Sequence, residues 1–418
     1  MDLREYIQEM AKGAKQGSRA LAKATSVTKN KALQTMASLL KERISFLIEE
    51  NKKDIADAQE KGLSTAMLDR LTLNEKRIIE MADGIMEIAN LHDPVGEILY
   101  MRKRPNGMSV GKMRVPIGVI CIIYESRPNV TADATALCLK AGNAVILRGG
   151  SEAFHSNKAI VDILKEAVAS ESLPKSIISF VEYKDRAAIY ELVQAEGLID
   201  VVIPRGGEGL IRTVTEHSRI PVLKHYKGVC HVYVDRDCDL KMAEEVCFNA
   251  KVQRPGTCNA METMLVDAAI AKEFLPVMLE RFAKAGVTLK GCTKTREFYN
   301  DVNPYSEEDL YNEYLDLILN VKIVKDMDEA IEHINKYGSA HTDSIVTTNN
   351  QKGLRFLLEV DSSAVMVNAS TRLNDGGQFG LGAEIGISTD KIHARGPMGI
   401  EELTSTKFIV FGDGQLRQ

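Results

Sequence analysis

From about residue 110 onward, short apolar segments alternate with segments of helical periodicity, and this alternation constrains the fold of the chain most strongly. The apolar segments are rich in β-branched residues, which is typical of strands buried on both faces of a sheet. They cover residues 119–123, 144–147, 177–181, 201–203 and 229–234, and helical segments at 156–169 and 186–195 lie between them. The pattern predicts an α/β fold with a doubly wound, mostly parallel sheet.

The rest of the chain predicts a second α/β domain. After residue 258 the alternation resumes, with strands expected near Met264 and Ile345 and helices over 272–285 and 328–336. The first hundred residues predict helices, because an apolar stripe at helical spacing runs through residues 33–48. A chain of 418 residues exceeds what one hydrophobic core usually serves. We expect a domain over residues 1–250, a second over 251–368, and a returning segment with a terminal strand over 369–418.

Two segments fit neither domain. Residues 100–114 predict a strand and a tight turn, because Asn106-Gly107 favours the positive φ angles of a hairpin. Residues 406–412 predict a lone strand. An unpaired strand edge invites a partner. Either both strands cover the chain's own sheet, or they form a small β flap that joins subunits, and the pattern does not decide between the two.

The composition excludes several classes of partner. A net charge of −5 and a pI near 6.0 give no electrostatic reason to expect nucleic acid or an anionic membrane. Seven cysteines without paired spacing indicate reduced thiols, and the absence of CxxC and HExxH motifs leaves a metal site unsupported. No apolar run approaches the ~20 residues that span a bilayer, and the N-terminus has no apolar signal region. We expect a soluble cytoplasmic protein.

Cys258 is the strongest candidate for a nucleophile. It lies in a polar turn between a helical run at 242–249 and an apolar strand at 262–266. Pro255 ends the helix because it lacks an amide donor, and Gly256 permits backbone angles closed to other residues. A thiol reacts as thiolate and therefore needs an electropositive, partly open setting, which Arg254 and Lys251 suggest. Most free cysteines are inert, as we expect of three in apolar or helical runs, Cys121, Cys138 and Cys247.

Two strand ends carry paired glycines where a phosphate group would fit. The chain has no GxGxxG motif, but Arg148-Gly149-Gly150-Ser151 and Arg205-Gly206-Gly207 each follow a predicted strand. A helix N-terminus attracts phosphate through its unpaired amides, and glycine lets the backbone approach closely. Ordinary loop chemistry would also place glycines there. Two such pairs, each with an arginine, indicate a polyphosphate ligand at the carboxyl edge of the sheet.

Four segments together resemble one family over essentially the whole chain. They are residues 124–131 (YESRPNVT), 251–259 (KVQRPGTCN), 380–388 (GLGAEIGIS) and 393–399 (HARGPMG). They are similar to the aldehyde dehydrogenase superfamily and, within it, to the glutamate-5-semialdehyde dehydrogenase family, also called γ-glutamyl phosphate reductase.

The resemblance implies a function and an architecture. The reaction is the NADPH-dependent reduction of L-glutamyl 5-phosphate to L-glutamate 5-semialdehyde plus phosphate, through a thioacyl intermediate on Cys258, as the second step of proline biosynthesis from glutamate. The implied fold has a cofactor domain, a catalytic domain and a small β oligomerisation flap. It further implies a homo-oligomer, either dimer or tetramer, and functional coupling to glutamate 5-kinase.

Cofactor residues carry over by position. Glu313 resembles the glutamate that holds the nicotinamide ribose, and Arg148 the lysine that contacts the adenosine ribose. Ser151 stands where NAD-using relatives often keep a glutamate that would repel a 2′-phosphate. A serine beside Arg148 would accept that phosphate, so the resemblance favours NADPH. Further cofactor contacts are expected at the second strand end, at Arg205, Gly206 and Gly207.

Substrate residues are expected among side chains that suit anions. The oxyanion donors are the Cys258 amide and a side chain from Ser126 or Arg127. Arg127, Arg254 and Arg395 are candidates for the phosphate and α-carboxylate, because a guanidinium binds both groups in bidentate fashion. Salt bridging at the surface is the alternative for at least one of them. The loop over 376–382, with Phe379, resembles the substrate mouth of the superfamily.

The segment 223–228 distinguishes between related enzymes. Aldehyde-oxidising relatives keep a glutamate there that activates water, whereas this chain has no carboxylate. The loss of this glutamate fits an enzyme whose thioester is discharged by hydride and not by water. Lys224 and His225 would either favour an anionic substrate or lie solvated in the loop. The competing hypotheses are an aldehyde-oxidising or CoA-acylating dehydrogenase of the same superfamily, and a non-catalytic scaffold, which an intact Cys258 disfavours.

Overall fold

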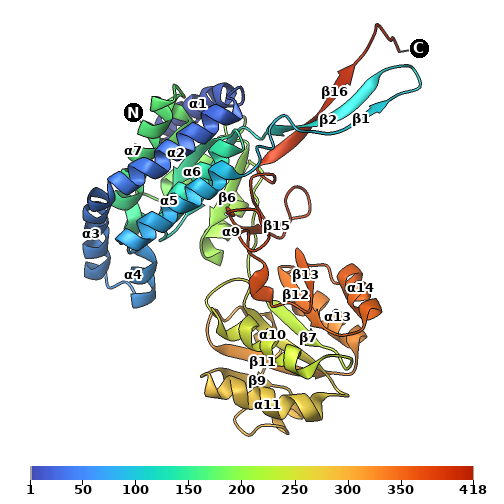
Figure 1. Ribbon diagram of the computed structural model, residues 1–418. Coiled ribbons are helices and arrows are strands. Elements are labelled where there is room, and N and C mark those ends of the chain that lie inside the picture. The colour runs from blue at the N-terminus through green and yellow to red at the C-terminus, as the bar shows by residue number, and fades with distance from the viewer. Residues whose placement is uncertain (1, 418) are drawn as a thin grey trace. The chain divides into compact units, whose positions relative to one another are not determined.

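The predicted strands form two separate parallel sheets, each in its own part of the chain. The computed structural model describes residues 2–417, apart from the side chain of Ala66. Unit 1 comprises Met1–Lys224, Gly380–Gly386 and Met398–Gln418, and unit 2 comprises His225–Phe379 and Ile387–Pro397 (Figure 1). The division falls at Lys224, whereas the sequence suggests residue 250, because β7 (Cys230–Val234) pairs with strands of unit 2. The returning segment 369–418 is shared between the units.

Within residues 2–417, unit 1 contains a four-stranded parallel sheet in the order β5-β4-β3-β6. Its strands are β3 (Val119–Tyr124), β4 (Ala144–Arg148), β5 (Ile178–Phe180) and β6 (Val201–Arg205). Every residue in them is buried except Arg205 at the end of β6. Both faces of the sheet are therefore covered, which confirms the doubly buried strands that the apolar segments predict.

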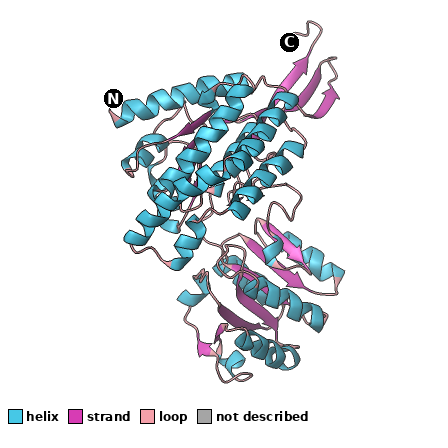
Figure 2. Ribbon diagram, turned by 60° about the vertical axis from the view of Figure 1, so that its left-hand side comes forward, coloured by secondary structure: helices cyan, strands magenta, loops and turns pink. Residues whose placement is uncertain are grey.

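Helices connect and enclose this sheet (Figure 2). The strands β3, β4, β5 and β6 are followed in turn by α6 (Asn129–Lys140), α7 (Phe154–Ser170), α8 (Ala187–Val193) and α9 (Glu208–His217). The N-terminal helices are α1 (Leu3–Leu21), α2 (Ser26–Glu42), α3 (Ile44–Glu60), α4 (Thr65–Leu71) and α5 (Glu75–Asn90). α1 begins at a capping box between Asp2 and Glu5. The predicted stripe is buried at Leu33, Met36 and Leu40, where α2 packs against α5 and α7.

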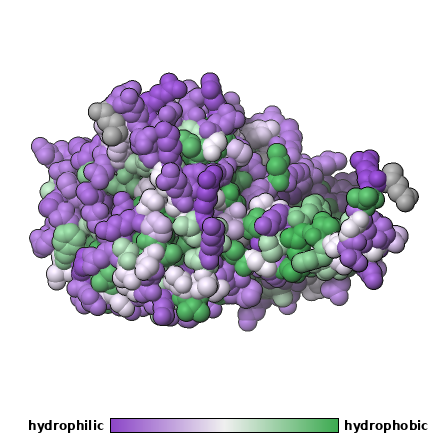
Figure 3. Space-filling model, turned by 90° about the horizontal axis from the view of Figure 1, so that it is seen from above, coloured by the Kyte–Doolittle hydropathy of each residue, from purple (hydrophilic) through white to green (hydrophobic). Residues whose placement is uncertain are grey.

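A three-stranded antiparallel sheet, which we call the flap, projects from unit 1 (Figure 1). It orders β1 (Ile98–Lys103), β2 (Ser109–Pro116) and β16 (Thr404–Phe411), with the predicted turn at Gly107. The two stray segments therefore pair with each other and not with the four-stranded sheet. Both outer strands expose large apolar or aromatic side chains: Ile98, Leu99, Tyr100, Met101, Phe408, Val410 and Phe411. Figure 3 shows green, hydrophobic patches on the surface of the molecule.

Unit 2 is built, over its described residues, on a seven-stranded parallel sheet in the order β10-β9-β11-β8-β7-β12-β13. Its strands after β7 are β8 (Met261–Asp267), β9 (Thr288–Gly291), β10 (Asn303–Pro304), β11 (Ile318–Val324), β12 (Thr342–Val346) and β13 (Ala364–Val367). The helices are α10 (Leu240–Val252), α11 (Ala271–Lys284), α12 (Thr293–Arg296), α13 (Met327–Tyr337) and α14 (Asn350–Glu359). α10 and α11 share one hydrophobic core and α13 and α14 another, so this unit is doubly wound as predicted.

A short antiparallel ribbon of β14 (Ile387–Ser388) and β15 (Gly396–Pro397) completes unit 2. None of the helices in the described part of the chain combines the length and apolar character that a membrane-spanning helix requires.

Candidate active site

Cys258 lies in the loop that joins α10 to β8. α10 ends at Val252, three residues before Pro255, and β8 begins at Met261. The hydroxyl of Thr257 donates to the carbonyl of Arg254 at 2.9 Å, and the amide of Ala260 donates to the carbonyl of Thr257 at 3.0 Å. These bonds hold a tight turn that leaves Cys258 half-buried, at the entrance to a fully buried strand.

Four other thiols of the chain lie in settings that suppress reactivity. Cys121, Cys138, Cys230 and Cys247 are fully buried. Burial raises the pKa of Cys121 to about 12 and raises the pKa of the other three as well. A thiol with so high a pKa carries almost no thiolate at neutral pH. These positions agree with the inert role predicted for Cys121, Cys138 and Cys247.

Two histidines accompany Cys258. One ring nitrogen of His225, one of His341 and the Cys258 sulfur all lie within 4.8 Å of one another. The two imidazoles meet at a ring-centroid distance of 5.2 Å and an angle of 71°. Nδ1 of His225 lies 2.7 Å from the carbonyl oxygen of Ile387, and His341 is fully buried. The cluster therefore places two imidazoles, each able to accept or donate a hydrogen bond, beside the thiol.

Gly228 packs directly on the nucleophile loop. A β carbon added there would lie 1.8 Å from the carbonyl oxygen of Cys258. The segment 223–228, in which the sequence shows no carboxylate, is thus in contact with Cys258 and supplies His225 instead. We had expected His225 to attract an anion or to lie solvated, and His341 was not expected at all.

The positive charge near Cys258 comes from arginines and not from Lys251. Nζ of Lys251 lies 2.7 Å from the carboxylate of Glu262, and both side chains are fully buried, so its charge is neutralised. Arg372 donates to Gln253 at 2.9 Å and also to Asn259. Burial, and then the nearby charge of Arg254, lower the pKa of Arg372, whereas the charge of Cys258 acts to raise it. The sequence analysis missed Arg372.

Four further predicted residues of unit 2 are either paired, exposed or half-buried. Nη2 of Arg395 lies 2.8 Å from both the carbonyl and the carboxylate of Asp361, which makes Arg395 the salt-bridging member of the three candidate arginines. Arg254 and Phe379 are exposed. Glu313 is half-buried near Glu262: burial raises the pKa of Glu262 to about 7, Lys251 opposes this, and the charge of Glu313 adds a smaller rise.

In unit 1 the glycine pairs lie on either side of β3. Because the sheet order is β5-β4-β3-β6, the ends of β4 and β6 both adjoin the end of β3. Arg148-Gly149-Gly150 and Arg205-Gly206-Gly207 therefore share one carboxyl edge, as predicted. Gly207 caps α9, and its amide donates to the carboxylate of Glu125 at 3.0 Å.

Arg148 and Ser126 are engaged by neighbouring groups. Arg148 is 6% exposed and donates to the carbonyls of Gly149, Lys184 and Asp185 at 3.0–3.4 Å, so it holds the loop after β5. Ser126 has φ +43°, and its amide and hydroxyl both donate to Glu152, at 2.7 and 2.6 Å. Ser151, in contrast, is exposed.

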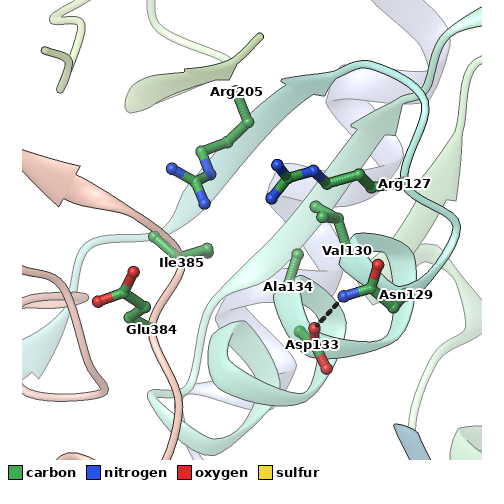
Figure 4. Close-up of a pocket in the computed structure, with 8 residues that line it drawn as sticks. All are labelled: Arg127, Asn129, Val130, Asp133, Ala134, Arg205, Glu384 and Ile385. Atoms are coloured by element: carbon green, nitrogen blue, oxygen red, sulfur yellow. Dashed lines mark hydrogen bonds between the residues drawn. The ribbon is translucent and has the colours of Figure 1, made fainter. Parts of the chain in front are cut away.

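A cavity of about 140 Å³ opens at this edge (Figure 4). The guanidinium groups of Arg127 and Arg205 project into it from the ends of β3 and β6, and Glu384 lies across from them. The first turn of α6 forms the floor, where Asn129 donates to Asp133 at 3.1 Å and burial raises the pKa of Asp133 to about 6. Two cations, a carboxylate and a helix N-terminus make this cavity suited to an anionic ligand with polar hydroxyls.

The chain contains two α/β units, each built on a parallel sheet. One unit has arginines and glycines at its strand ends, and the other has a cysteine before a buried strand. This combination defines a class of dehydrogenase. Residues 3–317 match the aldehyde dehydrogenase family, and the chain belongs to that family. Within it, the chain belongs to the gamma-glutamyl phosphate reductases. It is 66% identical over 418 residues to the gamma-glutamyl phosphate reductase of Thermodesulfovibrio yellowstonii, with both chains covered completely.

Solved structures agree with this assignment. The crystal structure of gamma-glutamyl phosphate reductase from Thermotoga maritima has a TM-score of 0.97 at 49% identity, covering 99% of this chain and 100% of that one. An engineered glycolyl-CoA reductase with bound NADP+ shares the fold, with a TM-score of 0.67 at 15% identity, covering 97% of this chain and 96% of that one.

Proposed function

We propose that this chain reduces L-glutamyl 5-phosphate to L-glutamate 5-semialdehyde with NADPH and releases phosphate, in proline biosynthesis from glutamate. The setting of Cys258 carries the proposal: a half-buried thiol near two imidazoles and a guanidinium, in contact with a segment that holds no carboxylate. A thiolate there attacks an acyl phosphate, and no carboxylate stands in that segment to activate water against the thioester.

The chain's own residues perform the covalent part of the reaction. The Cys258 sulfur bonds to the acyl carbon, and the bond from that carbon to the phosphate oxygen breaks. When bound, NADPH supplies the hydride that reduces the thioester. Breaking the carbon–sulfur bond then releases the aldehyde and frees Cys258. The Cys258 amide remains our candidate oxyanion donor, and Ser126 remains a prediction for that role. Arg127, also predicted for it, is assigned below to a cofactor phosphate.

The carboxyl edge of the unit 1 sheet fits a nicotinamide dinucleotide phosphate. Arg127 and Arg205 face one cavity with Glu384, and the N-terminus of α9 lies beside it with Gly206 and Gly207. The guanidiniums would hold phosphate and Glu384 a ribose hydroxyl, and Glu313 remains the candidate for the nicotinamide ribose. Exposed Ser151, with no carboxylate at its position, would leave room for the 2′-phosphate, while Arg148 positions the loop beside it.

The anionic ends of the substrate need cations near Cys258. Because Arg395 is bound to Asp361, Arg254 and Arg372 are the better hosts for the phosphate and the α-carboxylate. A cysteine and two histidines are donors that Zn²⁺ also prefers. A metal ion on those three atoms would block the nucleophile, so the proposed reaction assigns none.

The test is reduction of NADP+ by the purified protein with L-glutamate 5-semialdehyde, with and without phosphate. We expect the reaction to require phosphate or arsenate as acceptor from the thioester. Comparable oxidation to free glutamate without phosphate would favour an aldehyde-oxidising dehydrogenase, and oxidation that requires coenzyme A would favour a CoA-acylating one.

The exposed apolar edges of the flap suit a second copy of the chain, because an open edge strand pairs readily with another. We therefore propose a homo-oligomer, dimer or tetramer. The resemblance further leads us to propose that it works in the cytoplasm and is functionally coupled to glutamate 5-kinase. Size-exclusion chromatography with light scattering tests the assembly, and deletion of β16 should disrupt it.

A further inference from the structure

We infer that His225, from the segment that holds no carboxylate, takes the proton of the Cys258 thiol, and that His341 donates an N–H group to the thiolate formed. The inference rests on the proposed function in one respect, namely that Cys258 is the nucleophile. It adds the group that activates this nucleophile and the group that stabilises it.

The three residues meet because of the strand order of unit 2. His225 lies shortly before β7, Cys258 shortly before β8, and His341 directly before β12. These strands are neighbours, in the order β8-β7-β12, and all are parallel. Their amino ends therefore meet at one edge, which brings the three reactive atoms within 4.8 Å. Catalytic hydrogen bonds are often long before substrate binds, so this spacing is compatible with proton transfer in the substrate complex.

The contacts of His225 fix which of its nitrogens faces the thiol. Nδ1 lies 2.7 Å from the carbonyl oxygen of Ile387. A carbonyl only accepts hydrogen bonds, so Nδ1 carries the hydrogen. In the neutral ring Nε2 then has a free lone pair, and it is the nitrogen left to meet Cys258. His225 is therefore in the tautomer that accepts a proton from sulfur.

The contacts of His341 fit the opposite tautomer. The amide nitrogen of Asn374 donates to the hydroxyl oxygen of Thr342 at 2.7 Å, and that oxygen lies 2.7 Å from Nδ1 of His341, which also lies 3.7 Å from the Cys230 sulfur. A hydroxyl group can accept from Asn374 and donate at the same time, so we assign its hydrogen to Nδ1. Nδ1 then accepts, and Nε2 of the neutral ring carries the hydrogen. His341 is thus prepared to donate to a thiolate.

Cationic, neutral and acidic groups surround the cluster of Cys258, His225 and His341. On the positive side, Arg372 interacts with Cys258 and lies near Arg254. On the neutral side, Cys230 donates its thiol hydrogen to the carbonyl of Cys258 at 3.2 Å, and burial raises its pKa so that it stays a thiol. Three carboxylates, Asp343, Glu262 and Glu313, act electrostatically on Cys230 and so lie near the cluster. Of these, Asp343 is paired with His231 at 2.8 Å and Glu262 with Lys251.

The proton balance of the reduction follows. The proton moves from sulfur to Nε2 of His225, and the thiolate bonds to the acyl carbon. The carbon–oxygen bond breaks, phosphate departs with that electron pair, and His225 passes the proton to it, so hydrogen phosphate leaves and not the strongly basic trianion. After reduction of the thioester, breakage of the carbon–sulfur bond returns the thiolate. One proton taken up from solvent restores the imidazolium, which matches the one proton consumed by the overall reaction.

The experiment measures alkylation of Cys258 by iodoacetamide in cofactor-free enzyme from pH 5 to 10, following the Cys258 peptide by mass spectrometry. His225→Asn is the main variant, because its side-chain amide can still donate to the Ile387 carbonyl while the base is lost. His341→Gln keeps an N–H near the position of Nε2. His92→Asn, an exposed histidine of unit 1, is the control.

We expect the wild-type thiol to titrate at least about one unit below the ordinary cysteine pKa of about 8.5. His225→Asn should raise that apparent pKa by about one unit or more, and lower the alkylation rate at pH 6.5 about tenfold. His341→Gln should shift it less, and His92→Asn not at all. A merely structural role would not move this titration.

An unshifted profile in a folded His225→Asn enzyme would overturn the inference, as would a larger shift in His341→Gln. If His225→Asn does not fold, the wild-type profile decides, because a thiol titrating at or above about 8.5 excludes the pair. No turnover is involved, so failure here leaves the phosphate-dependent reaction to its own test.

Discussion

Replacing Gly228 with alanine should disable the enzyme by displacing Cys258, without removing any functional group. A β carbon on Gly228 would lie 1.8 Å from the carbonyl oxygen of Cys258 and 2.7 Å from its Cα. Real β carbons essentially never come closer than 3.0 Å to another heavy atom, so the two backbones must separate by at least 1.2 Å, the difference between 3.0 and 1.8 Å. A misplacement of about 1 Å at a reacting group costs on the order of 100-fold in rate. Overpacking also costs about 1–3 kcal/mol of stability.

The assay is kcat for phosphate-dependent reduction of NADP+, measured beside the unfolding temperature. Gly84→Ala is the matched control, because a β carbon on Gly84, within α5, meets nothing within 4 Å. We expect kcat to fall about 100-fold in Gly228→Ala and to stay unchanged in Gly84→Ala, which helix propensity should stabilise by up to about 1 kcal/mol. Near-wild-type kcat in Gly228→Ala would refute the argument that this contact positions the nucleophile.

Three further predictions use other parts of the chain. Cys258→Ala should lower kcat by several orders of magnitude while folding and NADPH binding persist, and turnover near a tenth of wild type would contradict the mechanism. Ser151→Glu should weaken NADPH more than NADH, by on the order of 1–3 kcal/mol, and an unchanged ratio of kcat/KM values would mean that Ser151 does not face the ribose. Partial burial would raise the pKa of Asp309, but hydrogen bonds from Lys290 and Ser306 hold it at about 2. Its stabilisation is therefore complete above the ordinary carboxyl pKa of about 4 and is lost as pH falls toward 2, so Asp309→Asn should flatten the acid limb of unfolding free energy against pH. An identical acid limb in Asp309→Asn would contradict this.

The strands were predictable because burial on both faces leaves a continuous apolar signal. The division of the chain was less accessible, since β7 resembles the strands before it in sequence. β7 joins unit 2 because it pairs with β12. In that pairing His231 of β7 lies opposite Asp343 of β12, which is 112 residues later in the chain. Such a long-range pairing cannot be read from local composition.

The candidate site was predictable where one residue type carries the chemistry, as Cys258 does. His341 was not, because it approaches Cys258 only through the order β8-β7-β12, and the sequence does not give strand order. Lys251 and Arg148 show the opposite failure. Each has the right charge in the right segment, but Glu262 neutralises Lys251, while Arg148 donates to backbone carbonyls and its role at the cofactor stays a prediction. Charge in sequence does not tell which partner a buried side chain meets.

The flap also sets an order on biosynthesis. Arg114 on β2 meets Thr404 on β16, a partner 290 residues further along the chain. At about 5–20 residues per second, a ribosome needs roughly 15–60 s to make that partner after β2 emerges. Throughout that delay the edge of β2 that β16 will cover stays open, and from the synthesis of β6 onward the four-stranded sheet is complete in sequence. A nascent chain would thus hold a folded first sheet beside an unfinished one, a period in which a chaperone that shields strand edges has most to offer.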